Sequence, residues 1–313
     1  MSVLQRFLFR RSFLALAVAG SVGIGSQAFG QAPAPTKIPE PEEISVTTKD
    51  GVRIMATYLP SAKGKDAAVC ILLHGFKGNR RDMASLGIHL QKNEVAVVMP
   101  DLRGHGDSTT VTVDGVDRKF EAATMPVQQL KLMSNDLEAI KKFLVAENNA
   151  GELNIERLGV VAAEMSVPIA VNWTVDDWSW PVLPNLKQGQ DVKALALLSP
   201  QMTFKTLNMS QAITNPASPI RDKISLLLIA GAEDDVSVRD ATRIEQTFAR
   251  IRPKVDKDKI ADKTLFIEVS IKTKLVGTKL LGEANLGVED LINQFVQLRL
   301  VDTLYPWKER KSP

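Results

Sequence analysis

"LGVVAAEMSVPIA", residues 158–170, is the stretch that decides the fold of this 313-residue chain. Its first half is a short apolar run typical of a buried strand, and its second half, with Pro168 near the start, favours a helix. Small residues, Ala162 and Ser166, stand two positions before and after Glu164. A sharp strand-to-helix turn needs small residues there, because bulky side chains would collide. We therefore predict a tight turn with Glu164 at its centre.

The chain on either side of this turn alternates between apolar runs and helical stretches. Short, continuous apolar strands that alternate with helices are typical of a mostly parallel sheet with helices on both faces, an α/β fold. Residues 43–60 alternate in polarity around Lys49-Asp50-Gly51, which predicts an antiparallel N-terminal hairpin at the sheet edge. We expect buried strands at 67–73, 95–100, 158–163, 192–200, 224–231 and 264–270, and helices at about 80–92, 127–147, 165–175, 237–251 and 286–300.

Three further motifs follow predicted strands. They are "LLHGFKGNRRDM" (72–83), "MPDLRGHGDST" (99–109) and "LLLIAGAEDDVSV" (226–238). Together with the turn, in this order, they resemble the α/β-hydrolase fold superfamily, which includes serine hydrolases and esterases, over residues 43–302. The resemblance implies chemistry at the carboxyl ends of the strands. It also implies a G-x-S-x-G turn with a serine nucleophile, followed along the chain by an acid and then a histidine.

The sequence departs from that pattern at two of the three catalytic positions. Glu164 stands where the resemblance places the serine, and no serine of the chain has glycines two positions away on both sides. No histidine occurs after His105, and Val276 occupies the place of the late histidine. Asp234 stands at the position of the acid. The resemblance also implies an oxyanion site made by the backbone N–H groups of Phe76 and Met165. A degenerate catalytic triad is the result.

Several roles for Glu164 stay open at this stage. It could act as a carboxylate nucleophile, as a general base, as a metal ligand together with Asp234 and His105, or only as an anionic side chain at a helix start. No metal-ligand spacing supports the third role, so we predict neither a metal nor another cofactor. We expect Ser166 to lie two residues into the helix and to point away from the site. We expect His74 to be a hydrogen-bonded structural residue, with His105 as the one histidine able to substitute.

The two ends of the chain indicate export and solvent exposure rather than a part of the fold. Residues 1–30 have a basic start, an apolar stretch and small residues near Ala28 and Gly30, as a secretory signal peptide does. Arg10-Arg11 before an apolar stretch resembles the twin-arginine type. Residues 31–42 form a Pro-rich linker, 43–302 the α/β-hydrolase-like domain, and 303–313 a basic C-terminal tail, which we expect to be a solvated end.

Charge and hydropathy narrow the function further. Without residues 1–30, basic and acidic side chains balance at 36 each, so no electrostatic argument favours nucleic acid. Past the N-terminus no apolar run is long enough for a stable membrane span. We expect an exported protein, periplasmic or extracellular, that binds an unknown small molecule or protein without conventional serine-hydrolase activity. The alternative is a hydrolase of small esters or related acyl substrates that uses non-standard groups.

Overall fold

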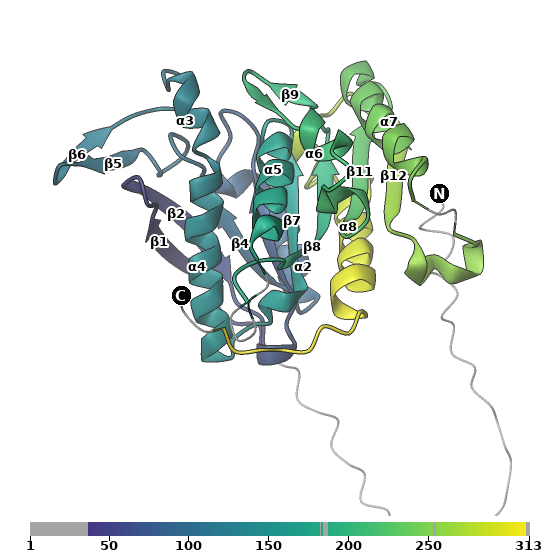
Figure 1. Ribbon diagram of the computed structural model, residues 1–313, viewed down its shortest axis with the longest axis horizontal. Helices are drawn as coiled ribbons and strands as arrows, with labels where there is room; N and C mark the ends of the chain where they lie inside the picture. The colour runs from purple at the N-terminus through teal and green to yellow at the C-terminus, as the bar shows by residue number, and fades with distance from the viewer. Residues whose placement is uncertain (1–36, 182, 184–186, 253–254, 311–313) are drawn as a thin grey trace, which may run out of the picture.

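The computed structural model describes residues 37–181, 183, 187–252 and 255–310. The predicted signal peptide and residues 31–36 of the predicted linker lie outside these residues. The described chain forms one large mixed sheet in the order β12-β11-β8-β7-β3-β4-β2-β5-β6, in which β6 and β12 lie at opposite sides of the molecule (Figure 1). Its parallel strands are β3 (Val69–Leu73), β4 (Ala96–Pro100), β7 (Leu158–Ala163), β8 (Val192–Leu198), β11 (Ser225–Gly231) and β12 (Leu265–Ile271).

Helices bury both faces of these strands. On one face the core contains side chains of α4 (Ser134–Ala150), α5 (Ser166–Ser179) and α7 (Asp235–Ala249). On the other face it contains side chains of α2 (Ala84–Lys92) and α8 (Val288–Val296). Alternate residues of one strand enter the two cores, so every position of β7 is buried. This is why the parallel strands are continuous apolar runs rather than alternating ones, and the predicted α/β-hydrolase type of sheet is confirmed.

The predicted N-terminal hairpin is also present. β1 (Glu42–Thr47) pairs antiparallel with β2 (Val52–Leu59), and β2 pairs antiparallel with β4. The connecting turn needs a left-handed residue, which Gly51 supplies with φ +81°. A hydrogen bond from Gly51 N–H to Thr48 O, at 3.0 Å, closes the turn. The expected antiparallel edge therefore forms where the alternating pattern placed it.

The sheet extends beyond this hairpin through a second one that our sequence interpretation missed. β5 (Thr110–Val113) pairs with the start of β2, and β6 (Val116–Lys119) pairs with β5. Asp114 and Gly115 both have positive φ, +51° and +75°, as a two-residue hairpin turn requires. A second difference lies just after it. The helix expected over 127–147 is two helices, α3 (Val127–Lys131) and α4, because the α-helical hydrogen bonding gives way to tighter turns at residues 132–133, where Leu132 N–H donates to Gln129 O and Met133 N–H to Leu130 O.

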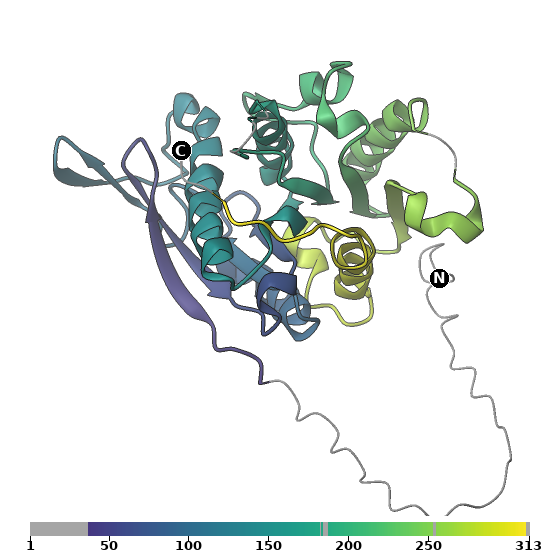
Figure 2. The same cartoon turned by 60° about the horizontal axis from the view of Figure 1, so that its bottom comes forward.

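The expectation of a solvated C-terminal tail is wrong at Arg310, which is buried, whereas Lys308 and Glu309 are exposed as expected. After α8 and its π-helical end (Gln297–Val301), the chain crosses to α4 (Figure 2). Trp307 Nε1 donates to the carbonyl of Asn148 at 3.2 Å. Arg310 is only 5% exposed and pairs with Glu156, at 3.2 Å, and with Asp191. The buried acids therefore account for the positive charge of Arg310.

The remaining elements are short. Between β8 and β11 the chain forms a two-stranded sheet of β9 (Thr203–Phe204) and β10 (Leu207–Asn208), then α6 (Ser210–Thr214). Among the described residues, no helix combines the length and the apolar character that crossing a membrane requires.

Candidate functional site

The turn at Glu164 is a strained junction between β7 and α5. Glu164 has φ +48°, in the left-handed region that side chains other than glycine rarely adopt. Its N–H donates to Leu198 O at 3.0 Å, and its carbonyl accepts from Val167 N–H at 3.1 Å. The first bond ties the turn to the neighbouring strand β8, and the second begins the helix. The backbone therefore presents the Glu164 side chain outward at the carboxyl end of the sheet, as the sequence predicted.

Two glycines make room for the Glu164 side chain. A Cβ atom placed on Gly75, in the loop after β3, would overlap Oε2 of Glu164. A Cβ atom on Gly277 would overlap the same carboxylate from the other side. Gly277 also has φ +56°, which favours glycine independently. The carboxylate thus lies in a slot between two loops, one after β3 and one before the 3₁₀ turn Gly277–Leu280.

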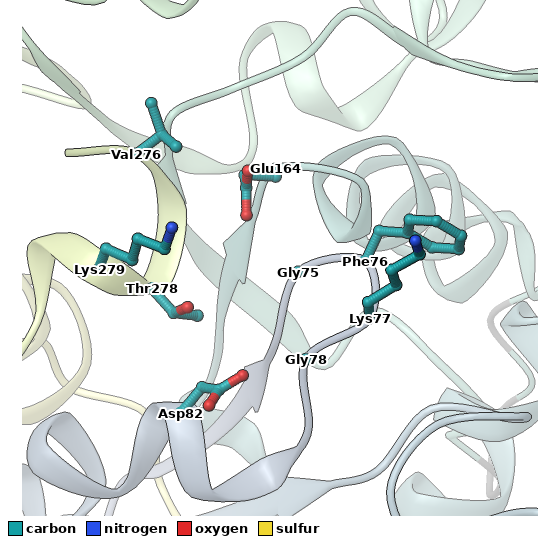
Figure 3. Close-up of a pocket in the computed structure, with 9 residues that line it drawn as sticks. All are labelled: Gly75, Phe76, Lys77, Gly78, Asp82, Glu164, Val276, Thr278 and Lys279. Atoms are coloured by element: carbon teal, nitrogen blue, oxygen red, sulfur yellow. The ribbon is translucent and has the colours of Figure 1, made fainter. Parts of the chain in front are cut away.

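The slot opens into a pocket of about 270 Å³ (Figure 3). Three segments form it: the loop after β3, the turn at Glu164 and the start of the Gly277–Leu280 turn. Its size is near the lower end of small-molecule sites. It is lined by Gly75, Phe76, Lys77, Gly78, Asp82, Glu164, Val276, Thr278 and Lys279.

The carboxylate of Glu164 is half-buried and lacks a hydrogen-bond donor within the described chain. Burial raises the pKa of Glu164, because removing the charged form from water is unfavourable. The positive charge of Lys279 opposes this effect on the pKa, and the negative charge of Asp234 adds to it. Figure 3 shows the Lys279 side chain directed toward Glu164. The site therefore holds an acidic group whose pKa is set by its burial and by the charges of Lys279 and Asp234.

The two backbone groups predicted for an oxyanion site have no acceptor in the described part of the chain. Phe76 lines the pocket, and Met165 follows Glu164 directly at the start of α5. Neither N–H forms a hydrogen bond with a described residue. N–H groups at a helix start are free to bind an acceptor, and the helix dipole favours negative charge there. The site therefore keeps one N–H without an acceptor in the pocket lining, that of Phe76, and a second at the buried start of α5, that of Met165.

Of the predicted acid and histidine positions, Val276 lines the pocket and Asp234 does not. Asp234 is the N-cap of α7, and its Oδ2 accepts from Ser237 N–H at 3.2 Å. It lies outside the pocket lining but close enough to influence the charge of Glu164. Val276 lines the pocket directly with an apolar side chain that cannot transfer a proton. The next residue, Gly277, donates its N–H to Ser199 Oγ at 2.8 Å.

The serine nearest the turn is occupied in structural bonds. Ser166 is fully buried, and its Oγ accepts from Ala163 N–H at 3.0 Å. The same hydroxyl lies at donor distance from Ala163 O, 2.8 Å, and from Leu73 O, 3.1 Å. These bonds join the turn to β3 below the pocket. As expected, Ser166 points away from the site.

The histidines of the two loops also support structure. His74 Nε2 accepts from Leu102 N–H at 3.1 Å, so its Nδ1 carries the proton and donates to Gly75 O at 2.7 Å. His105 is 3% exposed and stacks near His74 with ring centroids 5.0 Å apart. Burial, and the neighbouring His74, lower the pKa of His105 to about 4. His105 Nε2 has no partner in the described chain and does not line the pocket.

A metal site from Glu164, Asp234 and His105 was one of the roles left open. The described residues contain no group of three His, Cys, Asp or Glu side chains with metal-binding geometry. The three side chains are thus not brought together, although all come from the same rim of the sheet.

Three charged pocket residues were missed by the sequence interpretation. Lys77 and Asp82 come from the 72–83 motif, and Lys279 comes from the segment after Val276. Each lay within or next to a recognised motif. Their pattern carried no signal of its own, because charged residues in loops usually face solvent.

Comparisons with known proteins bear on the fold. No protein-family model matches the sequence, and no curated protein matches it. An esterase of Pyrococcus furiosus is structurally similar, with a TM-score of 0.58 at 15% identity over 83% of this chain and 92% of its own. A dienelactone hydrolase of Anabaena variabilis has a TM-score of 0.53 at 14% identity, over 83% and 99%. An esterase of Rhizomucor miehei has a TM-score of 0.56 at 11% identity, over 83% of this chain and 83% of its own.

This chain adopts the α/β-hydrolase fold. The strand order, the two helical layers and these likenesses agree on it. In an α/β-hydrolase fold the turn after β7 is the nucleophile position, and here it holds Glu164. The positions that the sequence analysis expects for the acid and the histidine, Asp234 and Val276, follow later in the chain. At sequence identities this low, structural similarity establishes the fold alone. The chemistry therefore follows from the residues of the site.

Proposed function

We propose that this chain is an exported α/β-hydrolase-fold protein that binds a ligand or partner in its cleft without conventional serine-hydrolase activity. The observation that carries the proposal is Glu164 in the left-handed turn at the nucleophile position. Serine hydrolysis needs a hydroxyl there and an imidazole within hydrogen-bond reach. Glu164 supplies no hydroxyl, and Val276 supplies no imidazole.

The nearby groups do not replace what is lost. Ser166 is buried and its hydroxyl is engaged by backbone groups of Ala163 and Leu73. An activated nucleophile is instead exposed to substrate and bonded to a base. His105 is buried outside the pocket lining, and its lowered pKa keeps it neutral. A neutral imidazole can act as a base, but only where it reaches the proton that is transferred.

Hydrolysis of small esters by non-standard groups is the second candidate. The free N–H groups of Phe76 and Met165 favour it, because they are the donors that stabilise an acyl-transfer oxyanion. The raised pKa of Glu164 also brings that carboxylate closer to the range of a general base. A covalent ester on Glu164 would still need a base to release it, and the pocket lining offers no histidine.

Activity-based labelling separates these two functions. We expect the full chain to show no fluorophosphonate labelling and no turnover of p-nitrophenyl acetate or butyrate above the uncatalysed rate. Single Glu164→Ser should remain unlabelled, because the histidine is missing independently. Glu164→Ser with Val276→His would supply both lost groups and tests whether the scaffold still supports them.

Two outcomes would contradict the leading function, and a third would contradict the argument from the missing histidine. Turnover by the unmodified chain that Glu164→Gln abolishes would establish carboxylate chemistry. Labelling abolished by Ser166→Ala, with a distant Ser210→Ala control unaffected, would establish Ser166 as a nucleophile. Strong labelling of single Glu164→Ser would show that a base other than the late histidine serves the site.

A further inference from the structure

The pocket at Glu164 carries both signs of charge in equal number. Its lining contains two carboxylates, Asp82 and Glu164, and two ammonium groups, Lys77 and Lys279. The other lining residues are the small or hydroxyl-bearing Gly75, Gly78 and Thr278 and the apolar Phe76 and Val276. Binding sites are complementary in charge to what they bind. A lining without net charge therefore fits a ligand that is neutral overall and bears polar groups of its own.

Glu164 provides one end of this recognition. Its carboxylate is half-buried and receives no hydrogen bond from the described chain. Gly75 and Gly277 hold the slot open, since a side chain at either position would occupy the space of the carboxylate. A half-buried carboxylate without a donor in the described chain has lost part of its contact with water and gained no hydrogen bond in exchange. A cationic N–H donor from a ligand is the strongest partner that it can gain.

Donor groups lie close to Glu164 as well. The N–H groups of Phe76 and Met165 have no acceptor in the described chain. The ammonium of Lys279 lies close enough to act on the charge of Glu164, and Thr278 adds a hydroxyl to the lining. Thr278 and Lys279 lie on one side of Glu164, and Phe76 lies on the other (Figure 3). A ligand whose ammonium is bound to Glu164 would find the donors for an anionic oxygen among these groups.

We propose that the pocket binds a small zwitterion of the α-amino acid type, with its ammonium on Glu164 and its carboxylate toward Lys279 and the free N–H groups. The proposal rests on the proposed non-catalytic binding function and names its ligand class. A simple amine would satisfy Glu164 but face the Lys279 ammonium. A simple carboxylate would satisfy Lys279 but face Glu164. Because like charges repel, only a molecule with both groups is favoured on both sides.

The direct test is isothermal titration calorimetry of the full chain with the common L-amino acids. L-leucine is then compared with isopentylamine and 4-methylpentanoate, or the best-binding amino acid with its own amine and acid analogues. We expect one or more amino acids to bind about tenfold or more tightly than either analogue. Absence of heat with every amino acid overturns the proposal. Equal affinity for the amine or the acid overturns it too.

Two substitutions assign the two ends of the ligand. Glu164→Gln and Lys279→Met should each weaken amino-acid binding by about tenfold or more. Glu283→Gln and Lys274→Met are matched controls, because both residues are exposed and lie outside the lining. Circular dichroism checks that each variant is folded. Binding unchanged in either pocket variant contradicts the proposal.

The pH dependence gives a readout that a structural role of Glu164 would not produce. The charged groups that face Glu164 are Lys279, Asp234 and, across the pocket, Lys77 and Asp82. Burial raises the pKa of Glu164 above its usual value of 4.5. Protons then compete with the ligand ammonium, so affinity should fall as the pH is lowered through that raised pKa. Glu164→Gln should remove this dependence.

The outcome is separate from that of the labelling experiment. Ester turnover would contradict the non-catalytic function whether or not amino acids bind. Absence of amino-acid binding would contradict the ligand class alone and would leave the non-catalytic function in place.

Discussion

Glu164 is the residue on which the interpretation of this protein depends, and its backbone is costly. A residue other than glycine in the left-handed region is destabilised by about 1–2 kcal/mol. The chain nevertheless has glutamate at φ +48°, with its side chain in a slot that two glycines keep open. A strained residue held by its surroundings is typical of a functional position. We therefore propose that the strained position is kept for the Glu164 side chain and its functional role, rather than for the shape of the turn.

This strain is measurable by comparing two substitutions at one position. Glu164→Ala and Glu164→Gly both remove the carboxylate, but only glycine relieves the left-handed backbone. We expect Glu164→Gly to be more stable than Glu164→Ala by about 1 kcal/mol in urea denaturation. Both should lose ligand binding equally. Alanine as stable as glycine would show that the turn relaxes away from positive φ.

At the level of elements, the C-terminal segment is a structural part of the domain. It runs from the end of α8 across to α4 (Figure 2). There Arg310 pairs with Glu156 and Asp191. Asp191 also pairs with Lys141 at 3.1 Å, and Lys187 pairs with Asp191 at 3.0 Å. The segment thus completes a buried ionic network that links α4 to the start of β8.

Removing one member of a buried network leaves the other charges without compensation. We expect Arg310→Ala to lower the free energy of unfolding by about 3–5 kcal/mol. Lys308→Ala, two residues earlier and exposed, is the matched control, with an expected change within about 0.5 kcal/mol. Urea denaturation with both variants gives the comparison. A similar small effect of both would mean that the segment does not contribute to stability as its contacts indicate.

The elements also show how far sequence patterns reach. Parallel strands appeared as apolar runs because both of their faces are buried. The β5–β6 hairpin lacked such a run because it is largely exposed, although Asp114-Gly115 between alternating residues was a usable signal. The local sequence pattern could not predict that the C-terminal segment packs against the domain. Its partners, Glu156 and Asp191, lie more than a hundred positions away in sequence.

At the scale of the whole molecule, the described residues are organised around one large sheet, with a pocket at the carboxyl ends of its parallel strands. The N-terminal region adds a separate property, the proposed export. Residues 1–30 hold three arginines and no acidic residue, whereas the rest of the chain is balanced in charge. This asymmetry supports a targeting role for the first thirty residues rather than a role in the cleft.

Export has a direct test in a bacterial host with a twin-arginine pathway. We expect the chain to reach the periplasm with a new N-terminus near residue 30, as intact mass would measure. Arg10→Lys together with Arg11→Lys should retain it in the cytoplasm, whereas Arg6→Lys should not. Export of the double variant would assign the signal to the general secretory route. Cytoplasmic retention of the unmodified chain would contradict export altogether.

The sequence by itself determined the fold class and the strand-to-helix turn. It also determined that no serine stands at the centre of that turn and that no histidine follows His105. These are local or countable features, since burial on both faces of a strand and the size limits of a tight turn are written in neighbouring residues. Only the tertiary structure decided that Gly75 and Gly277 enclose the Glu164 carboxylate, and that Lys77, Asp82 and Lys279 share its pocket. Three loops distant in sequence meet there because parallel strands end at one edge of the sheet.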